Sequence, residues 1–324
     1  MRIVVTGGAG FLGSHVAERL LAEGHEVLVL DDLSTGRIDH LPPGAVLRRA
    51  DVRDARAVGE ALVGAGLVLH LAAAVGPALV ARDPSGTWSR NVEGTARVLE
   101  AAAVHGTRVL LASTSEVYGP SAEGLLEEER PSELLTSARR DVYALSKAAG
   151  EAYALALART HLLPVTVARL FNVVGPRQGE RYGMVLARFA AAARAGRPLP
   201  VYGDGLQRRC FLHVQDAVTA LLLLARTPAC EGQVVNVGSA QEVTVLDLAQ
   251  RVLAATGSRA GLEHVPLERV YGEGFADPRR RLPSLARLEA LTGFRPARTL
   301  DDALCDVLGT CDASRPQPRP GARP

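Results

Sequence analysis

The sequence predicts an α/β protein built on a doubly wound parallel sheet, followed by a smaller α/β substrate-binding domain. Short runs rich in valine, leucine and isoleucine alternate with alanine-rich helical patterns, which is typical of parallel strands covered by helices on both faces. A glycine-rich turn joins the first strand-like run to the first helical pattern. The 324 residues, 47% of them hydrophobic, suffice for a large core and for two domains.

The expected strands are short apolar runs. They lie at 2–6, 26–30, 67–71, 108–112 and 165–169, with helical patterns at 11–23, 91–106 and 143–161 between them. After about residue 172 the alternation loosens into Gly-rich, charged loops, and such loops usually bind ligands. We expect a first domain over 1–171, to which a strand near 233–238 can return, and a substrate-binding domain over 172–311.

Charge and cysteine content narrow the possible partners. The net charge of +2 favours neither nucleic acid nor an anionic membrane as the main partner. The cysteines (Cys210, Cys230, Cys305 and Cys311) lack metal-ligand spacing and disulfide density, so we expect no metal and a reducing cytoplasm. We expect neither a leader segment nor a membrane span, and we expect the Pro- and Arg-rich tail over 312–324 to be disordered.

The turn "TGGAGFLG" (6–13) indicates a dinucleotide site. Gly7, Gly10 and Gly13 recur every three residues, and Phe11 and Leu12 open the helix. Glycines let the backbone approach a pyrophosphate, which then lies on the positive end of the helix dipole. A plain tight turn is the alternative, but the strand before and the helix after favour the dinucleotide.

Acidic residues after the next strands fit the same ligand. Asp31 and Asp32 end the second strand, where an acid can accept a hydrogen bond from a ribose hydroxyl and repel a 2′-phosphate. This favours NAD over NADP, although one of the two acids can be a simple turn residue. Asp51 can meet the adenine edge, or it can be a cap or turn acid.

A tyrosine and a lysine four residues apart suggest acid–base chemistry. In "YALSK" (143–147), Tyr143 and Lys147 share one face of a predicted helix. A nearby ammonium stabilises the phenolate and lowers the tyrosine pKa, so the phenolate can take a proton from a sugar hydroxyl as hydride leaves the carbon. Thr114, in the polar run that ends the strand at 108–112, can supply a second hydroxyl.

Taken together, these motifs resemble the extended short-chain dehydrogenase/reductase family, in its nucleotide-sugar epimerase, dehydratase and decarboxylase branch. The matching segments are "TGGAGFLG", "DVRD", "HLAA" (70–73), "STSEVYG", "YALSK", "RLFNVVGPRQ", "VYGDG", "RRCFLHVQD" and "DPRRRLPS". The resemblance implies a Rossmann domain that holds NAD and a smaller domain that holds a nucleoside-diphosphate sugar, with UDP-sugars favoured. It also implies a homodimer formed through the helices near 91–105 and 143–160. One departure is Ser284, where the family pattern usually has Asp.

The resemblance also implies roles for single residues. Tyr143 would be the base, Lys147 its partner and Thr114 a donor to the sugar O4. The cofactor would further contact Val52, Leu71, Ala72 and Ala73. The substrate would contact Ser115, Asn172, Val201, Tyr202, Arg209 and Arg281, with Asn172 and both arginines at the diphosphate. Arginine suits this task because its planar donors recognise phosphate oxygens in pairs.

Three reactions share the first step, oxidation at C4, and the sequence leaves the choice among them open. Glu116 resembles the acid of dehydratases and decarboxylases, but Ser115 stands where one class of dehydratase has a second acid. The loop "GPRQGERYGMVLARF" is more similar to epimerases, and Arg181, or alternatively Arg177, can anchor a sugar carboxylate and prevent its loss. We therefore expect 4-epimerisation of a UDP-hexuronate or UDP-hexose, with decarboxylation or 4,6-dehydration as the alternative.

Overall fold

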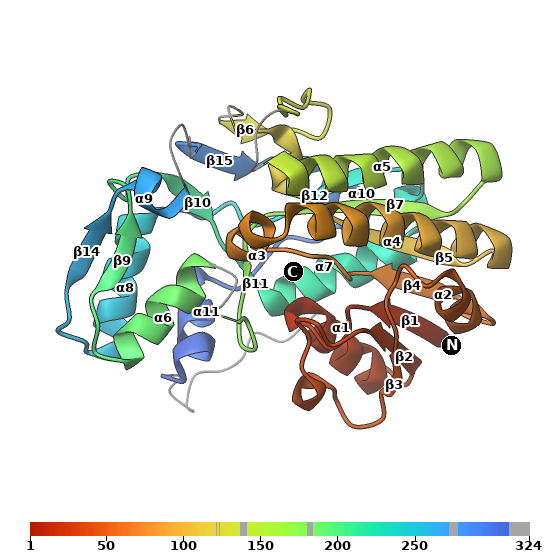
Figure 1. The fold of residues 1–324 in the computed structure, drawn as a ribbon, viewed down its shortest axis with the longest axis horizontal. Helices are drawn as coiled ribbons and strands as arrows, with labels where there is room; N and C mark the ends of the chain where they lie inside the picture. The colour runs from red at the N-terminus through yellow and green to blue at the C-terminus, as the bar shows by residue number, and fades with distance from the viewer. Residues whose placement is uncertain (121, 123, 137–140, 180–183, 272–277, 311–324) are drawn as a thin grey trace.

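The computed structural model describes residues 1–120, 122, 124–136, 141–179, 184–271 and 278–310, so Arg181 and Cys311 lie outside the described residues. Within this part, seven parallel strands form the central sheet, in the order β12-β7-β5-β4-β1-β2-β3 (Figure 1). The strands are β1 (Arg2–Thr6), β2 (Glu26–Asp31), β3 (Val46–Arg49), β4 (Leu67–His70), β5 (Arg108–Thr114), β7 (Val165–Leu170) and β12 (Val234–Val237).

The strand order reverses at β1, which pairs with β2 on one side and with β4 on the other. In open parallel sheets such a reversal opens a crevice outside the carboxyl ends of the strands, where ligands bind. The glycine turn follows β1, and Thr114 ends β5. The topology therefore brings the cofactor and catalytic motifs to the same edge of the sheet.

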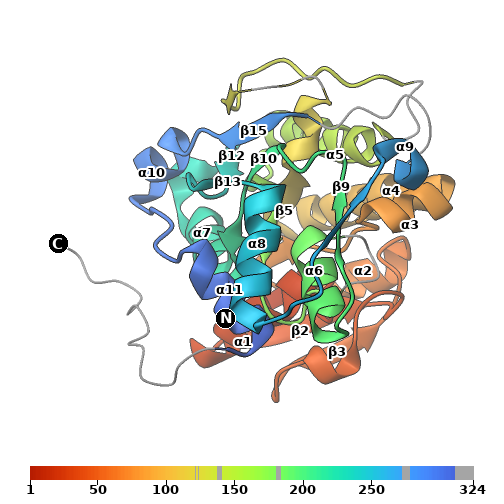
Figure 2. The same cartoon turned by 90° about the vertical axis from the view of Figure 1, so that its left-hand side faces the viewer.

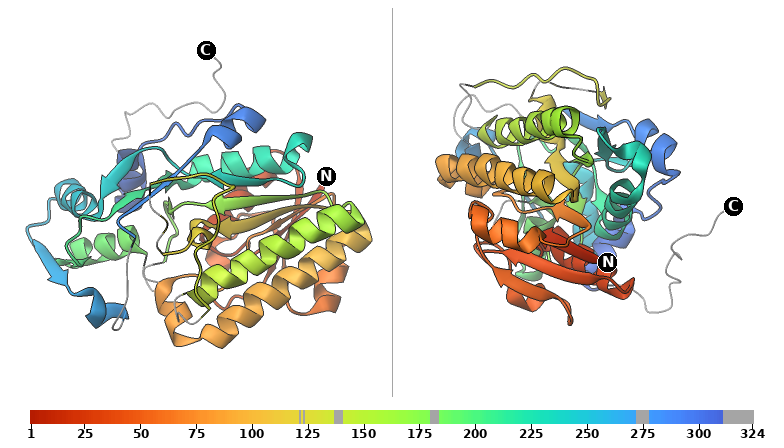
Figure 3. Two further views of the ribbon diagram at one scale, coloured as in Figure 1. Left: turned by 90° about the horizontal axis from the view of Figure 1, so that it is seen from above. Right: turned by 90° about the vertical axis from the view of Figure 1, so that its right-hand side faces the viewer.

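Helices cover both faces of this sheet, as Figure 3 shows from above. They are α1 (Phe11–Ala22), α7 (Val214–Arg226) and α10 (Ala286–Thr292) on one face, and α2 (Ala55–Leu62), α4 (Pro84–His105) and α5 (Asp141–His161) on the other. The short helix α3 (Pro77–Arg82) precedes α4. Long apolar stripes drive this packing, since Leu20, Leu221, Leu62 and Leu99 are fully buried against the strands.

The remaining elements form a smaller part beside the sheet, seen face-on in Figure 2. Its strands are β6 (Leu125–Leu126), β8 (Val173–Val174), β9 (Leu199–Tyr202), β10 (Arg208–Cys210), β11 (Leu212–His213), β13 (Glu242–Thr244), β14 (Leu262–Val265) and β15 (Arg280–Pro283). Its helices are α6 (Val185–Arg194), α8 (Val245–Thr256), α9 (Leu267–Tyr271) and α11 (Leu300–Leu308). This part has its own core, which includes Phe189, Leu199, Leu248 and Leu304.

The expected α/β fold with a doubly wound sheet is confirmed. The strands expected at 2–6, 26–30, 67–71, 108–112 and 165–169 all occur, with ends that differ by no more than two residues. The run at 234–238 supplies β12, which pairs with β7 at one edge of the main sheet. The sequence pattern misses β3, because this edge strand is only half buried and lacks a continuous apolar run. Among the described residues, no helix has both the length and the apolar character needed to span a membrane.

Candidate active site

The glycine turn forms a cradle that larger side chains would fill. Gly7 adopts a φ of 69°, and a Cβ there would lie 2.7 Å from the amide nitrogen of Ala72. A Cβ on Gly13 would lie 2.2 Å from the carbonyl oxygen of Gly7. Gly10 caps α1 without a side-chain hydrogen bond, so the first N–H groups of the helix, at Phe11 and Leu12, keep their capacity for an anion. These residues fit the pyrophosphate of a dinucleotide.

The two acids after β2 face different surroundings. Asp31 is 7% exposed, and its carboxylate accepts hydrogen bonds from the backbone N–H groups of Ala9 (2.9 Å) and Leu33 (2.8 Å). Burial raises the pKa of Asp31. Asp32 instead accepts from the backbone N–H and hydroxyl of Ser34 in an exposed turn. Asp31 therefore lies against the glycine turn and is the better placed of the two for a ribose, since a carboxylate can still accept further hydrogen bonds.

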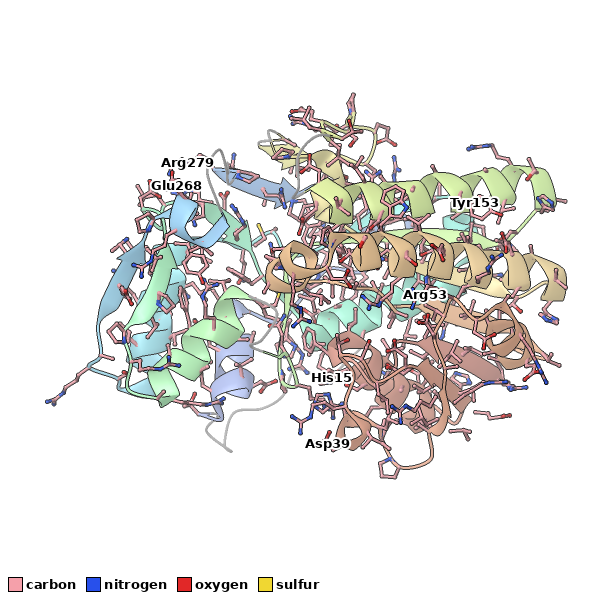
Figure 4. The ribbon with its side chains drawn as sticks, viewed as in Figure 1. His15, Asp39, Arg53, Tyr153, Glu268 and Arg279 are labelled. Atoms are coloured by element: carbon pink, nitrogen blue, oxygen red, sulfur yellow. The ribbon has the colours of Figure 1, made fainter. Side chains whose placement is uncertain are left out.

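Asp51 is held in a local turn. Its carboxylate accepts from the backbone N–H of Arg53 (2.8 Å) and forms an ion pair with that guanidinium (2.6 Å), which lowers the pKa of Asp51. Arg53, labelled in Figure 4, also donates to Ser89 on α4. This geometry agrees with the turn-acid interpretation. The neighbouring Val52 is buried against Gly94, where an added Cβ would approach the Val52 side chain to 2.6 Å.

A buried chain of side chains supports the predicted cofactor loops, and the sequence motifs did not reveal it. The Thr6 hydroxyl lies 2.7 Å from His70 Nδ1 and accepts from the Ala72 N–H, while His70 Nε2 lies 3.0 Å from the Thr95 hydroxyl on α4. Burial lowers the pKa of His70 to about 3, so the ring stays neutral. The loop from Leu71 to Ala73 is thereby tied to β1, since Leu71 N–H also donates to the Thr6 carbonyl.

A second buried link joins α4 to the helix that carries Tyr143. The Asn91 side chain accepts from the Ala74 N–H (2.8 Å) and donates to the hydroxyl of Ser146 (3.0 Å). Ser146 in turn donates to the Tyr143 carbonyl. The sequence offers no signal for Asn91, because it is one of several polar residues in α4 and its partners lie on other elements.

Tyr143 and Thr114 lie together at the end of β5. Both side chains are buried, at 7% and 8% exposure, and their hydroxyls share a hydrogen bond. The charge of Glu116 acts on the same phenol. The expectation of a lowered tyrosine pKa is wrong for the protein without ligands: burial, and then Glu116, raise the pKa of Tyr143. A phenolate at this position would therefore need positive charge nearby.

Lys147 lies one turn after Tyr143 on α5 and is 6% exposed. Burial lowers the pKa of its ammonium to about 8, and the charge of Glu151 opposes that effect. Lys147 is also the only lysine in the chain, since every other member of its 37 lysines and arginines is an arginine. Its ammonium can therefore gain and lose a proton near neutral pH, whereas a guanidinium is always charged.

Ser113, directly before Thr114, has a buried acidic partner that the motifs did not indicate. Its hydroxyl donates to the carboxylate of Glu151 on α5. Arg169 at the end of β7 pairs with the same carboxylate, with a shortest distance of 2.7 Å. The consecutive hydroxyls after β5 thus have separate tasks, because Ser113 anchors Glu151 whereas Thr114 contacts Tyr143. Ser115 is buried at the start of the next turn.

The predicted phosphate arginines occupy neighbouring strands. Arg209 on β10 is the register partner of Arg281 on β15, so the two lie side by side on one face of the smaller sheet. Arg208 and Arg280 project to the other face, where both pair with Glu242. Arg281 is 7% exposed. Arg209 donates to the carbonyls of Arg208 and Pro278.

Among the other predicted substrate residues, Asn172 lies in the loop between β7 and β8, and Val201 and Tyr202 lie on β9. Asn172 has a φ of 36°, and its side chain donates to the Cys210 carbonyl at 2.9 Å. Val201 is buried in β9, and the guanidinium of Arg188 lies 3.8 Å from the centre of the Tyr202 ring. Arg181 lies outside the described residues.

Comparisons with known proteins identify the family. The model of the NAD dependent epimerase/dehydratase family matches residues 3–238. The chain is 35% identical to the UDP-N-acetyl-alpha-D-glucosaminuronate decarboxylase of Bacillus cytotoxicus, over 95% of this chain and 96% of that protein. It is 37% identical to the dTDP-glucose 4,6-dehydratase of Streptomyces niveus, over 95% and 92%.

The fold agrees with the same relationship. The UDP-glucose 4-epimerase of Thermus thermophilus, solved in complex with NAD, superposes with a TM-score of 0.86 at 31% identity, over 96% of this chain and 98% of that one. These similarities extend over both parts of the molecule, and the family model spans the glycine turn and the Tyr143–Lys147 pair. The chain belongs to the NAD dependent epimerase/dehydratase family, and its cofactor is NAD.

Proposed function

We propose that the protein decarboxylates a UDP-hexuronate through a transient 4-keto sugar, with 4-epimerisation of such a sugar as the second candidate. The observation that carries the proposal is the carboxylate of Glu116, whose charge acts on the buried phenol of Tyr143. The Glu116 N–H donates to the Thr114 hydroxyl at 3.2 Å, so its carboxylate would lie near the sugar that Thr114 contacts. The decarboxylase of Bacillus cytotoxicus supports the same reaction class.

In the first step, Tyr143 as phenolate takes the proton from the O4 hydroxyl while hydride leaves C4. Thr114 donates a hydrogen bond to O4 and holds it against the base. Lys147 supplies the positive charge that makes the phenolate accessible despite its burial. The cofactor held by the glycine turn supplies the hydride acceptor and donor at C4.

In the second step, the C5–C6 bond breaks, carbon dioxide leaves, and the electron pair passes into the enolate between C5 and O4. Thr114 and the protonated Tyr143 stabilise the negative charge on O4. A C6 carboxylate beside Glu116 experiences repulsion between like charges, and loss of carbon dioxide removes that repulsion. A water molecule bonded to the Glu116 carboxylate then delivers a proton to C5 and regains one from solvent. Hydride would then return to C4 from the cofactor, and Tyr143 returns its proton to O4.

A 4,6-dehydration is disfavoured by the neighbour of Glu116. Elimination of water needs a base for the C5 proton and an acid for the leaving hydroxyl. Ser115 offers a hydroxyl where one class of dehydratase has a second acid. Decarboxylation needs one proton relay, which Glu116 alone can provide.

The specific argument for 4-epimerisation is Arg181. The sequence favours epimerisation because an arginine can anchor the C6 carboxylate in the ring plane and keep it from leaving. Arg181 lies outside the described residues, whereas the guanidinium of the alternative anchor, Arg177, pairs with Glu18 at 2.7 Å. The epimerase from Thermus thermophilus supports epimerisation as a second candidate.

We assign the binding residues accordingly. The cofactor would contact Gly7, Gly10, Phe11, Leu12, Gly13, Asp31, Val52, Leu71, Ala72, Ala73, Tyr143 and Lys147, with Asp32 and Asp51 in supporting turns. Ser115 and Asn172 would contact the sugar and the diphosphate, and the adjacent guanidinium groups of Arg209 and Arg281 would bind the diphosphate. Val201 and Tyr202 would border the base. The nucleotide domain would then comprise residues 1–171 together with β12.

A homodimer through α4 and α5 completes the proposal. These two helices lie side by side on one face of the sheet (Figure 3). Their outer surface exposes Trp88 and Tyr153, which are 43% and 37% exposed, and Figure 4 places Tyr153 on α5. Aromatic residues of this kind are enriched at protein interfaces. Sedimentation of the wild type and of a Tyr153→Glu variant would test the dimer, and a monomeric wild type would rule it out.

The deciding experiment is an incubation of the purified protein with NAD and either UDP-glucuronate or UDP-N-acetylglucosaminuronate, followed by proton NMR and mass spectrometry. A product that lacks the carboxylate establishes the decarboxylase. A product of unchanged mass with inverted C4 couplings establishes the epimerase and contradicts the first choice. A Glu116→Gln variant should retain C4 oxidation and lose most of the decarboxylation.

A further inference from the structure

Lys147 lies in a buried polar cluster in which one carboxylate opposes the effect of burial. The side chain is 6% exposed, and Glu151, one helical turn further along α5, is 5% exposed. Glu151 acts on Lys147 through its charge, whereas its direct ion pair is with Arg169. Residues four apart on a helix lie on one face, so this arrangement follows from the sequence spacing.

Glu151 is fixed in place from two strands. Ser113 at the end of β5 donates to one carboxylate oxygen. Arg169 at the end of β7 reaches both oxygens through its Nε and Nη2 atoms, at 2.7 to 3.2 Å. A carboxylate held by one hydroxyl and a paired guanidinium has little rotational freedom.

Arg169 continues this network toward the smaller sheet. Its Nη1 donates to the Glu128 carbonyl at 3.0 Å, and its guanidinium lies 4.8 Å from the centre of the Tyr118 ring. Tyr118 donates to the side chain of Asn236, which also donates to the carbonyls of Leu126 and Ser284. These are residues of β6 and of the segment directly after β15, the strand that carries Arg281.

The other groups near Lys147 do not supply a negative charge. On β4, His70 is neutral because its pKa is about 3. On α4, Thr95 and Asn91 are uncharged, as are Ser146 on α5 and Ser113 on β5. Tyr143 has a raised pKa, and Glu116 acts on that phenol. Among the described residues, Glu151 is the carboxylate whose charge supports the Lys147 ammonium.

We propose that Glu151, fixed by Ser113 and Arg169, is a positioning residue that keeps Lys147 in its charged form and in place for its work with Tyr143. The inference rests on the part that the proposed function gives to Lys147. It deepens that function, because the ammonium can stabilise the phenolate only while it carries its proton. Neither Glu151 nor Arg169 needs to touch the substrate for this effect.

The single lysine makes the proposal directly measurable. Protein produced with lysine labelled with carbon-13 at Cε gives one ε-methylene signal, whose chemical shift follows the protonation of Lys147. The titration is carried out on the full chain without substrate. For the wild type we expect a midpoint near pH 8, and for Glu151→Gln a midpoint lower by roughly one pH unit or more. For Arg169→Gln we expect a higher midpoint, since the cation that competes with Lys147 for the Glu151 carboxylate is then absent.

Two further variants separate this role from a structural one. Ser113→Ala retains all the charges and should lower the midpoint by less than Glu151→Gln. The matched control is Asp216→Asn, since Asp216 is 6% exposed and caps the backbone of Ala297 and Arg298 on the far side of the sheet. Asp216→Asn should leave the midpoint unchanged whatever it does to stability.

The outcomes are distinct. An unchanged midpoint in Glu151→Gln, or an equal change in Asp216→Asn, would overturn the proposal. If Glu151→Gln does not fold, a wild-type midpoint in Ser113→Ala together with a lowered midpoint in Arg169→Gln would overturn it. Since the titration uses no sugar, a lack of turnover on UDP-hexuronates would refute the proposed function without altering the titration result. Where turnover is found, its pH profile should narrow on the alkaline side in Glu151→Gln.

Discussion

Replacing Lys147 with methionine should stabilise the fold while abolishing turnover. The ordinary pKa of a lysine is 10.5, and burial lowers that of Lys147 to about 8. A difference of about 2.5 pH units, at about 1.4 kcal/mol each, means that the protonated lysine destabilises the folded state by roughly 3 kcal/mol at neutral pH. Methionine fills a similar volume without the charge, and Glu151 keeps its partner Arg169. We expect a gain of about 1–3 kcal/mol, because some relaxation around the ammonium already reduces the penalty.

The sign of the pH dependence makes this prediction specific. Because the pKa of Lys147 is lower in the folded state than in the unfolded chain, the penalty is fully present below about pH 8 and disappears as the pH rises toward 10.5. The assay is urea unfolding of the protein without NAD, at pH 7 and at pH 9.5, for the wild type and for Lys147→Met. Lys147→Arg is the control, since it retains the charge and should give no gain. An advantage of Lys147→Met that is absent at pH 7, or that is the same at both pH values, would refute the reasoning.

Three other substitutions test the site. Gly13→Ala should abolish NAD binding, measured by calorimetry, and lower stability, because its Cβ would lie 2.2 Å from the Gly7 carbonyl oxygen. The control is Gly59→Ala in α2, where an added Cβ meets no atom within 4 Å. It should be neutral or stabilise the fold by about 0.5–1 kcal/mol in urea unfolding. Tyr143→Phe should reduce turnover by about 10²- to 10⁴-fold and leave the NAD dissociation constant within a few-fold, and undiminished turnover would remove Tyr143 as the base. Asp31→Asn should weaken NAD binding in a fluorescence titration far more than Asp32→Asn, since only Asp31 lies against the glycine turn, and equal effects would contradict that assignment.

Much of the framework could be predicted from the sequence, because it depends on local rules. The strands at 2–6 and 108–112 are continuous apolar runs, and the glycine turn has a spacing that few other structures require. The supporting shell could not be predicted in this way. His70, Asn91 and Arg169 are single polar residues whose partners lie 25 to 64, 17 to 55 and 18 to 41 positions away, and no short pattern encodes such pairings. The raised pKa of Tyr143 could not be predicted for a related reason, since burial is a property of the folded chain and not of the motif.

Ser284, which departs from the family pattern, contacts the neighbouring elements through its backbone. The Ser284 N–H donates to the Leu126 carbonyl at 2.9 Å, and its own carbonyl accepts from the Asn236 side chain. Both contacts use main-chain atoms, so a serine in place of an aspartate leaves them intact. The residue that does need its side chain is Asn236, which joins Tyr118, Leu126 and Ser284 from its position on β12. Because β12 is an edge strand of the main sheet, this one amide connects that sheet with β6 and with the segment directly after β15, the strand that carries Arg281. Asn236→Leu should therefore weaken UDP binding and lower the stability of the fold. Ser284→Ala should change neither property. Impaired UDP binding in Ser284→Ala would show that the Ser284 side chain has a role that its backbone contacts do not explain.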